Sequence, residues 1–166
     1  MYNSLTIKIL KSTVYLLIML LLLAVPLKKS FGQGMEDPAS WTYELKKKSA
    51  TEYDVVFHLT LKDGWHIWSL NPGGDGYEIA PNFIFDRGDK LQLKGKVKEQ
   101  GKPVTQKVAG MPKPIIFFNS KVDFVQTVTI KSGEVKKITG EHQYQVCNES
   151  ICLPPKTKKF ELELKG

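Results

Sequence analysis

The sequence predicts an all-β protein, a single immunoglobulin-like antiparallel β-sandwich domain. Apolar and polar residues alternate with a period of two over most of residues 41–166, and no segment keeps a 3.6-residue apolar period. Turn signals that contain glycine, such as Lys62–Gly64 and Arg87–Asp89, separate the alternating runs. Seven to nine short strands at this spacing are typical of two packed antiparallel sheets.

The strands follow from the alternation in chain order. In Glu52–Leu61, Tyr53 and Val55 fall on one face, and Asp54 and His58 fall on the other. The remaining predicted strands are Trp41–Leu45, Trp65–Ser69, Asn82–Phe85, Leu91–Val97, Val122–Ile130, Ile138–Val146 and Phe160–Leu164.

A few residues depart from this pattern. Gln126 is polar at an apolar position of its predicted strand. Trp65, His66 and Trp68 are interpreted as packing residues. Gly73–Gly76 lacks the Lys-Ser/Thr and the following helix of a phosphate-binding loop, so it is predicted to connect two strands.

The N-terminus has the pattern of an export signal. Lys8 and Lys11 precede the apolar run Val14–Leu27, and Ser30 and Gly32 provide the small residues of a cleavage site. The predicted segments are a signal peptide at 1–32, a short linker at 33–40 and the domain at 41–166. An uncleaved N-terminal anchor is the alternative, and both predict a periplasmic domain.

The charge of the chain gives little support for nucleic-acid binding. The net charge is +7, but residues 1–33 contain four lysines and no acid. Without that segment 20 basic residues face 17 acidic ones. The remaining lysines alternate with acids, as on a solvated strand face.

The two cysteines of the chain, Cys147 and Cys152, are separated by four residues. Predicted strands flank them, so they close a hairpin as a cross-strand pair with an expected Cα separation of about 4.5–5.5 Å. If Tyr144 and Val146 face the core, alternation turns Cys147 toward solvent. Pro154 ends ladder pairing just beyond Cys152, which leaves that sulfur at a strand end.

A disulfide here is a weak staple, because closing so short a loop contributes only about 2 kcal/mol. This favours an exchangeable bond, although a static clip remains the alternative. A zinc site is disfavoured because there is no second cysteine pair and the three histidines are scattered.

The segments Tyr144–Cys147 and Cys152–Thr157 resemble the redox loop of the N-terminal periplasmic domain of the thiol:disulfide interchange protein DsbD. Gly64–Ser69 and Pro81–Phe85 are similar to other segments of that family, in matching order. The resemblance implies an immunoglobulin-like sandwich with a reversible disulfide and no cofactor.

The resemblance also implies roles for individual residues. Cys152 forms the mixed disulfide with a partner, and Cys147 resolves it. An aromatic side chain from a neighbouring loop caps the disulfide, and Phe117 or Phe118 lies where that cap would fall. Core packing is the alternative role for both. Tyr144, Pro154 and Pro155 support the redox loop.

This chain departs from the best-known members in two ways: they place five residues between the cysteines, and acids precede their cap, where this chain has Ile115 and Ile116. Lys156 and Lys158 are expected to favour a thiolate and Glu149 to oppose it.

The implied activity is that of a protein-disulfide reductase or interchange component. The implied donor is a thioredoxin-like protein or a membrane electron carrier, and the acceptors are oxidised periplasmic proteins. We expect a monomer that binds no nucleic acid and no metal. Two alternatives are a non-catalytic binding module with a structural bridge and a redox-linked scaffold that delivers clients without turnover.

Overall fold

The computed structural model describes residues 36–86, 90–131 and 135–164. These residues form strands and loops without a helix, so no helix among them is long and apolar enough to cross a membrane. The strands are β1 (Ala39–Lys47), β2 (Glu52–Leu61), β3 (His66–Gly73), β4 (Asn82–Phe85), β5 (Leu91–Gly101), β6 (Val104–Gln106), β7 (Ile115–Phe118), β8 (Lys121–Ile130), β9 (Lys137–Tyr144), β10 (Val146–Cys147) and β11 (Lys156–Glu163).

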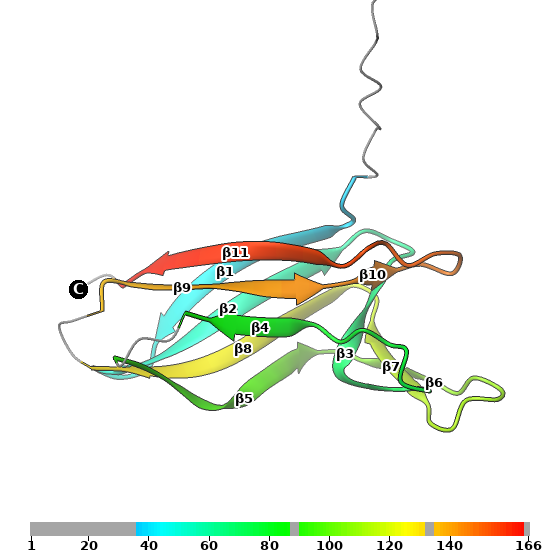
Figure 1. Cartoon of the computed structure of the whole chain (residues 1–166), viewed down its shortest axis with the longest axis horizontal. Coiled ribbons are helices and arrows are strands. Elements are labelled where there is room, and N and C mark those ends of the chain that lie inside the picture. The colour runs from blue at the N-terminus through cyan, green and yellow to red at the C-terminus, as the bar shows by residue number, and fades with distance from the viewer. Residues whose placement is uncertain (1–35, 87–89, 132–134, 165–166) are drawn as a thin grey trace, which may run out of the picture. The chain divides into compact units, whose positions relative to one another are not determined.

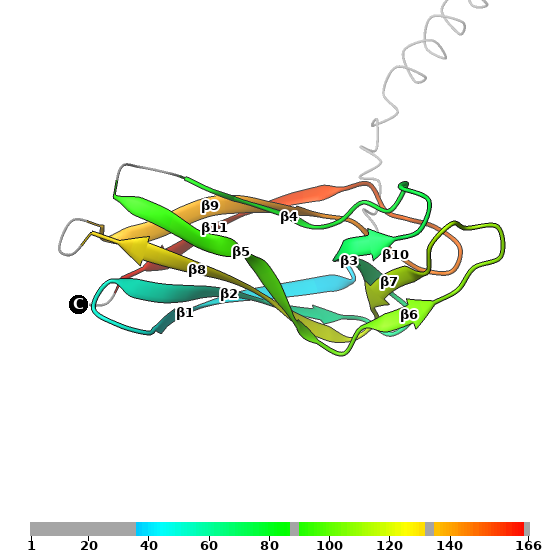
Figure 2. The ribbon, with the colours of Figure 1, turned by 90° about the horizontal axis from the view of Figure 1, so that it is seen from below.

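The strands form three antiparallel sheets, with the orders β1-β2-β8-β5, β11-β9-β4 and β10-β3-β7-β6. Figure 2 shows the first two sheets as the layers of a sandwich. The third sheet gathers at one end, where β9 leads into β10 (Figure 1). The predicted fold class, an all-β immunoglobulin-like sandwich, is confirmed.

Most predicted strands are present, with shifted ends. The strand predicted at Trp65–Ser69 continues to Gly73, so part of the predicted connection is strand. The strand predicted at Ile138–Val146 is broken at Gln145 into β9 and β10. Strands β6 and β7 were not predicted. Strand β7 was missed because Ile115–Phe118 is a run of four apolar residues without alternation.

The core between the two layers contains a cluster of aromatic rings. Phe57 is fully buried and packs its ring against Phe83 at 4.6 Å, Phe160 at 4.9 Å and Phe85 at 6.1 Å between centroids. These rings come from β2, β4 and β11, so the cluster joins the sheets. Packing of this kind contributes about 0.5–1.5 kcal/mol per aromatic pair beyond the burial of area.

One histidine lies inside this cluster of aromatic rings. His142 on β9 is 0% exposed, its ring stacks 5.8 Å from Phe83, and its Nε2 is 2.9 Å from the Tyr43 hydroxyl. Its Nδ1 has no hydrogen-bond partner among the described residues. Burial, and secondarily the positive charge of Lys158, lowers the pKa of His142 to about 4.

The exceptional Gln126 also has a structural explanation. It is buried at a bulge of β5 between Lys94 and Lys98, where Gly95 takes a φ of 73°. The side-chain Nε2 of Gln126 donates to the carbonyl oxygens of Lys94 at 3.3 Å and Thr127 at 2.7 Å. The amide therefore satisfies carbonyl groups where the ladder is irregular.

The predicted signal peptide at 1–32 lies outside the described residues. Within the predicted linker, Asp37 accepts a hydrogen bond from the Ala39 backbone amide, and β1 begins at Ala39. The fold thus includes the last residues of the segment predicted as linker.

Candidate functional site

The redox hairpin, residues 146–153, is closed by two backbone hydrogen bonds and a disulfide between Cys147 and Cys152. The Asn148 amide donates to the Ile151 carbonyl at 2.9 Å, and the Leu153 amide donates to the Val146 carbonyl at 2.9 Å. Asn148 also fixes the turn, since its Oδ1 accepts from the amides of Ser150 and Ile151, each at 2.8 Å. Such Asx turns explain why the chain reverses here.

The hydrogen bonds flank Cys147 and Cys152, so these residues form a non-hydrogen-bonded antiparallel pair. Pairs of this type bring Cα atoms closest together, and here the Cα separation is 3.9 Å. The predicted cross-strand arrangement is present, with a separation below the expected 4.5–5.5 Å.

The two cysteines differ in exposure. Cys152 is exposed, whereas Cys147 is 1% exposed. The prediction that Cys147 faces solvent is therefore wrong. Alternation does turn Cys147 away from the core residue Val146, but Cys147 has neighbours on both sides, His66 of β3 and Cys152. The side chains of these two neighbours flank Cys147 on the outer face of the sheet.

The outer face of the third sheet carries a row of aromatic side chains beside Cys147. Cys147 pairs with His66, and Trp68 pairs with Phe117. The His66 ring lies 4.8 Å from Trp68 and 4.9 Å from Phe117, between centroids. Because directly paired residues point to the same face, these side chains lie on the same side of the sheet as the Cys147 side chain.

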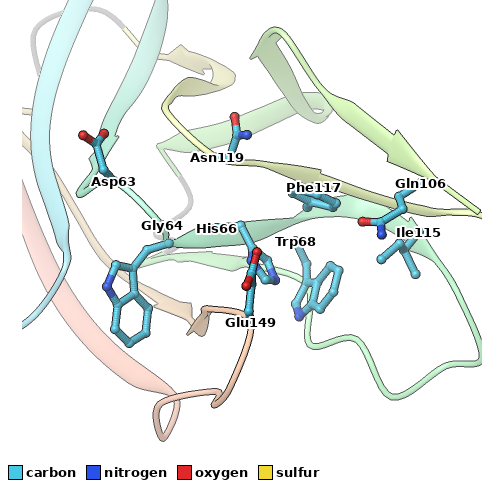
Figure 3. A pocket seen from close by; sticks show the side chains of 10 residues that line it. Asp63, Gly64, His66, Trp68, Gln106, Ile115, Phe117, Asn119 and Glu149 are labelled. Carbon is cyan, nitrogen blue, oxygen red and sulfur yellow. The ribbon is translucent and has the colours of Figure 1, made fainter. Parts of the chain in front are cut away.

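This row forms part of a pocket of about 710 Å³ (Figure 3). Asp63 and Trp65 contribute from before β3, Gln106 from β6 and Glu149 from the redox hairpin. The pocket therefore has an aromatic wall and two carboxylates, and it reaches the turn between the two cysteines.

The two predicted cap residues occupy opposite faces of β7, inside a strand rather than in a loop. Phe118 is 2% exposed and belongs to the core, beside Ile67. Phe117 is partly exposed and lines the pocket. Strand β3 lies between β7 and β10, so the side chain next to Cys147 in the row is His66.

His66 was interpreted from the sequence as a packing residue. Its Nε2 is buried and has no hydrogen-bond partner among the described residues. Burial lowers the pKa of the imidazole below its usual value of 6.5, so the ring is neutral near pH 7. His66 and Trp68 stand two residues apart in the predicted strand Trp65–Ser69, a spacing that could have indicated this wall, but nothing local indicated that Cys147 would pair with it.

The remaining predicted site residues surround the base of the hairpin. Tyr144 is 1% exposed, and its hydroxyl donates to Asp37 Oδ2 at 2.5 Å. Burial, reinforced by the hydrogen bond to Asp37, raises the pKa of Tyr144 far above its usual range. Pro154 and Pro155 are exposed and separate the hairpin from β11.

The lysines expected to favour a thiolate are engaged elsewhere. Lys156 and Lys158 place their Nζ atoms 3.3 Å and 3.5 Å from Asp37 Oδ2. Burial tends to raise the pKa of Asp37, but hydrogen bonds from Tyr144 and the Ala39 amide, together with Lys156, lower it overall. The positive charges of Lys156 and Lys158 therefore lie beside Asp37 and its hydrogen bond to Tyr144, at the base of the hairpin.

No group of three or more His, Cys, Asp or Glu side chains in the described part of the chain is arranged to hold a metal ion. The chemistry that this arrangement offers is that of one disulfide between an exposed and a buried cysteine, beside a neutral imidazole.

A comparison with protein-family models assigns the chain to a family. The family model described as "Thiol:disulfide interchange protein DsbD, N-terminal" matches residues 35–164. The chain belongs to this family. The match includes both cysteines and the whole sandwich, and it confirms the family resemblance seen in the sequence. No match was found among curated proteins.

Solved structures of similar fold include members of the same family. The N-terminal periplasmic domain of ScsB from Proteus mirabilis aligns with a TM-score of 0.57 and 18% identity over 76% of this chain. This chain spans only 47% of that chain's length. The reduced DsbD N-terminal domain of Neisseria meningitidis aligns with a TM-score of 0.47 and 16% identity, over 76% of this chain and 86% of that one. The GAE domain of yeast GGA1 gives a TM-score of 0.47 and 14% identity, over 78% and 96% of the two chains.

Proposed function

We propose that this protein is a periplasmic thiol–disulfide exchange domain that relays electrons through the Cys147–Cys152 pair. The observation that carries the proposal is the asymmetric disulfide, with Cys152 exposed and Cys147 buried, in a chain of the DsbD N-terminal family. A thioredoxin-like protein or a membrane electron carrier is the donor, and oxidised periplasmic proteins are the acceptors.

The exchange begins at the exposed sulfur. A donor thiolate attacks Sγ of Cys152, the bond to Cys147 breaks, and Cys147 leaves as a thiolate that takes up a proton. The second donor thiol, as thiolate, then attacks the donor sulfur in the mixed disulfide. The donor leaves oxidised, and Cys152 leaves as a thiolate that is protonated. The reduced domain runs the same steps in reverse on an oxidised acceptor, with Cys147 as the resolving thiol.

A redox titration tests this function. We expect the purified domain, equilibrated with dithiothreitol mixtures, to show a midpoint potential at or above about −270 mV, in the range of exchange-active pairs. A potential far below about −300 mV is the property of a structural bridge and would instead support the binding module with a static disulfide. Quantifying free thiols by alkylation and mass spectrometry gives the midpoint directly.

Phe117 was predicted to cap the disulfide directly. We now propose that it restricts access to the disulfide indirectly, by holding His66 beside Cys147. Phe117→Ala is therefore expected to increase the rate of reduction by dithiothreitol severalfold, with little loss of stability. Stopped-flow reduction of the oxidised domain measures this rate. An unchanged rate would contradict the role.

Phe118→Ala is the matched control from the opposite face of β7. Since Phe118 belongs to the core, we expect this variant to lose about 3–5 kcal/mol of unfolding free energy. Under conditions where it remains folded, its rate of reduction should stay close to that of the wild type.

A further inference from the structure

We propose that His66 is the proton-transfer group of Cys147, accepting the thiol proton when Cys147 resolves a mixed disulfide and returning it when Cys147 leaves. This inference rests on the proposed exchange function and names a residue that the exchange chemistry alone does not identify.

Position is the first argument. His66 on β3 and Cys147 on β10 are direct partners in the antiparallel register, so their side chains emerge on the same face. The Cβ atoms of such pairs lie about 4.5–5.5 Å apart, so the imidazole and the sulfur occupy neighbouring positions on one face. No other titratable side chain is paired with Cys147 in the described sheets apart from Cys152.

The orphaned nitrogen is the second argument. Buried polar atoms are almost always hydrogen-bonded, and an exception needs an explanation. In the disulfide form the Cys147 sulfur carries no proton and is only a weak acceptor, and Nε2 of His66 has no hydrogen-bond partner among the described residues. Reduction supplies the missing partner, because Cys147 then becomes a thiol or a thiolate at the paired position.

The surroundings of His66 suit proton transfer. Burial lowers the pKa of the imidazole, so the ring is a neutral base near pH 7. The charged side chains that share the pocket are Asp63, from the turn before β3, and Glu149, from the redox hairpin. From the neighbouring strands the pocket receives Phe117, Ile115 and Gln106, which carry no charge. Burial is the cause of the lowered pKa of His66, so the ring accepts the thiol proton as a neutral base.

The resolving step balances as follows. The Cys147 thiol gives its proton to Nε2 of His66, and the resulting thiolate attacks Sγ of Cys152. The Cys147–Cys152 bond forms as the bond from Cys152 to the partner sulfur breaks, and the electron pair leaves with the partner as its thiolate. The imidazolium then releases its proton to solvent through the open pocket.

The test isolates this step with a small probe. The reduced domain is mixed with 5,5′-dithiobis(2-nitrobenzoate): Cys152 releases one thionitrobenzoate, and Cys147 then releases the second in a unimolecular phase. In the wild type we expect the rate of the second phase to stay nearly constant down to about pH 6.5. In His66→Phe and His66→Gln the rate should fall about tenfold for each pH unit below the thiol pKa of about 8.5, a loss of about 100-fold at pH 6.5.

His58→Phe is the control, because His58 on β2 binds Asp123 at 2.8 Å and does not line the pocket. It should retain the wild-type profile. The slope of the second-phase rate against pH is measured within each variant, so a packing change that alters the rate equally at every pH does not imitate the effect. If His66→Phe folds poorly, His66→Gln provides a variant that keeps a polar side chain. A wild-type slope in both His66 variants would overturn the inference while leaving the exchange function intact. Absence of the second release in the wild type would overturn the exchange function, and the inference with it.

Discussion

Cys147→Ser is expected to leave a highly reactive thiol at Cys152, whereas Cys152→Ser leaves an almost unreactive thiol at Cys147. The reason is exposure, because Cys152 is exposed and Cys147 is 1% exposed. A buried thiol is difficult to reach and, in apolar surroundings, difficult to ionise. We expect a difference of about tenfold or more in the rate of reaction with oxidised glutathione, and a stable mixed disulfide at Cys152 in Cys147→Ser.

The two variants control for each other. Each loses the same disulfide, whose loop closure contributes about 2 kcal/mol, so loss of the bond itself does not explain a difference in reactivity. Mass spectrometry of the glutathione adducts over time gives both rates. Equal rates, or faster reaction at Cys147, would contradict the assignment of Cys152 as the attacked sulfur. Both variants should be inactive in complete turnover, because neither contains the pair.

Acid is expected to destabilise the sandwich through His142 between about pH 6.5 and pH 4. The pKa of His142 is lowered to about 4 in the folded protein, against about 6.5 in the unfolded chain. The unfolded state therefore binds more protons in this window, and the stability present above pH 6.5 is lost as the pH falls toward 4. The full shift corresponds to about 3 kcal/mol of unfolding free energy.

Urea unfolding at pH 7, 5.5 and 4.5 measures this loss. His142→Gln should be less stable at pH 7 but should show a much flatter response over the same window, since the titrating group is absent. Asp37 contributes in a different range: its lowered pKa means that its stabilising contacts are lost only below about pH 3.8. An undiminished pH dependence in His142→Gln would show that His142 is not the source.

Much of the fold was predictable because one face of most strands meets the core. Residues 52–61 alternate regularly, and β2 begins and ends at the predicted residues. The strand prediction failed where both faces of a strand are buried. Ile115 and Phe118 on β7 are both buried, although alternation would put them on opposite faces. A short strand covered on both sides gives a run of apolar residues, which periodicity does not distinguish from other buried segments.

The candidate site was predictable to the extent that it is local in sequence. The hairpin pairing of Cys147 with Cys152 follows from their spacing and flanking strands. The burial of Cys147 and its pairing with His66 depend on how β10 docks against β3, two strands far apart in the chain. The same is true of Lys156, whose charge was expected near the thiols but meets Asp37 near the start of the domain.

The unequal accessibility of the two sulfurs has a kinetic consequence for the proposed relay. If every intermolecular bond forms at Cys152, donor and acceptor compete for a single covalent attachment point and cannot occupy it together. Turnover is then a double-displacement cycle, in which the domain alternates between two stable redox forms and dissociates from one protein before it engages the next. A ternary complex of donor, domain and acceptor has no place in that cycle.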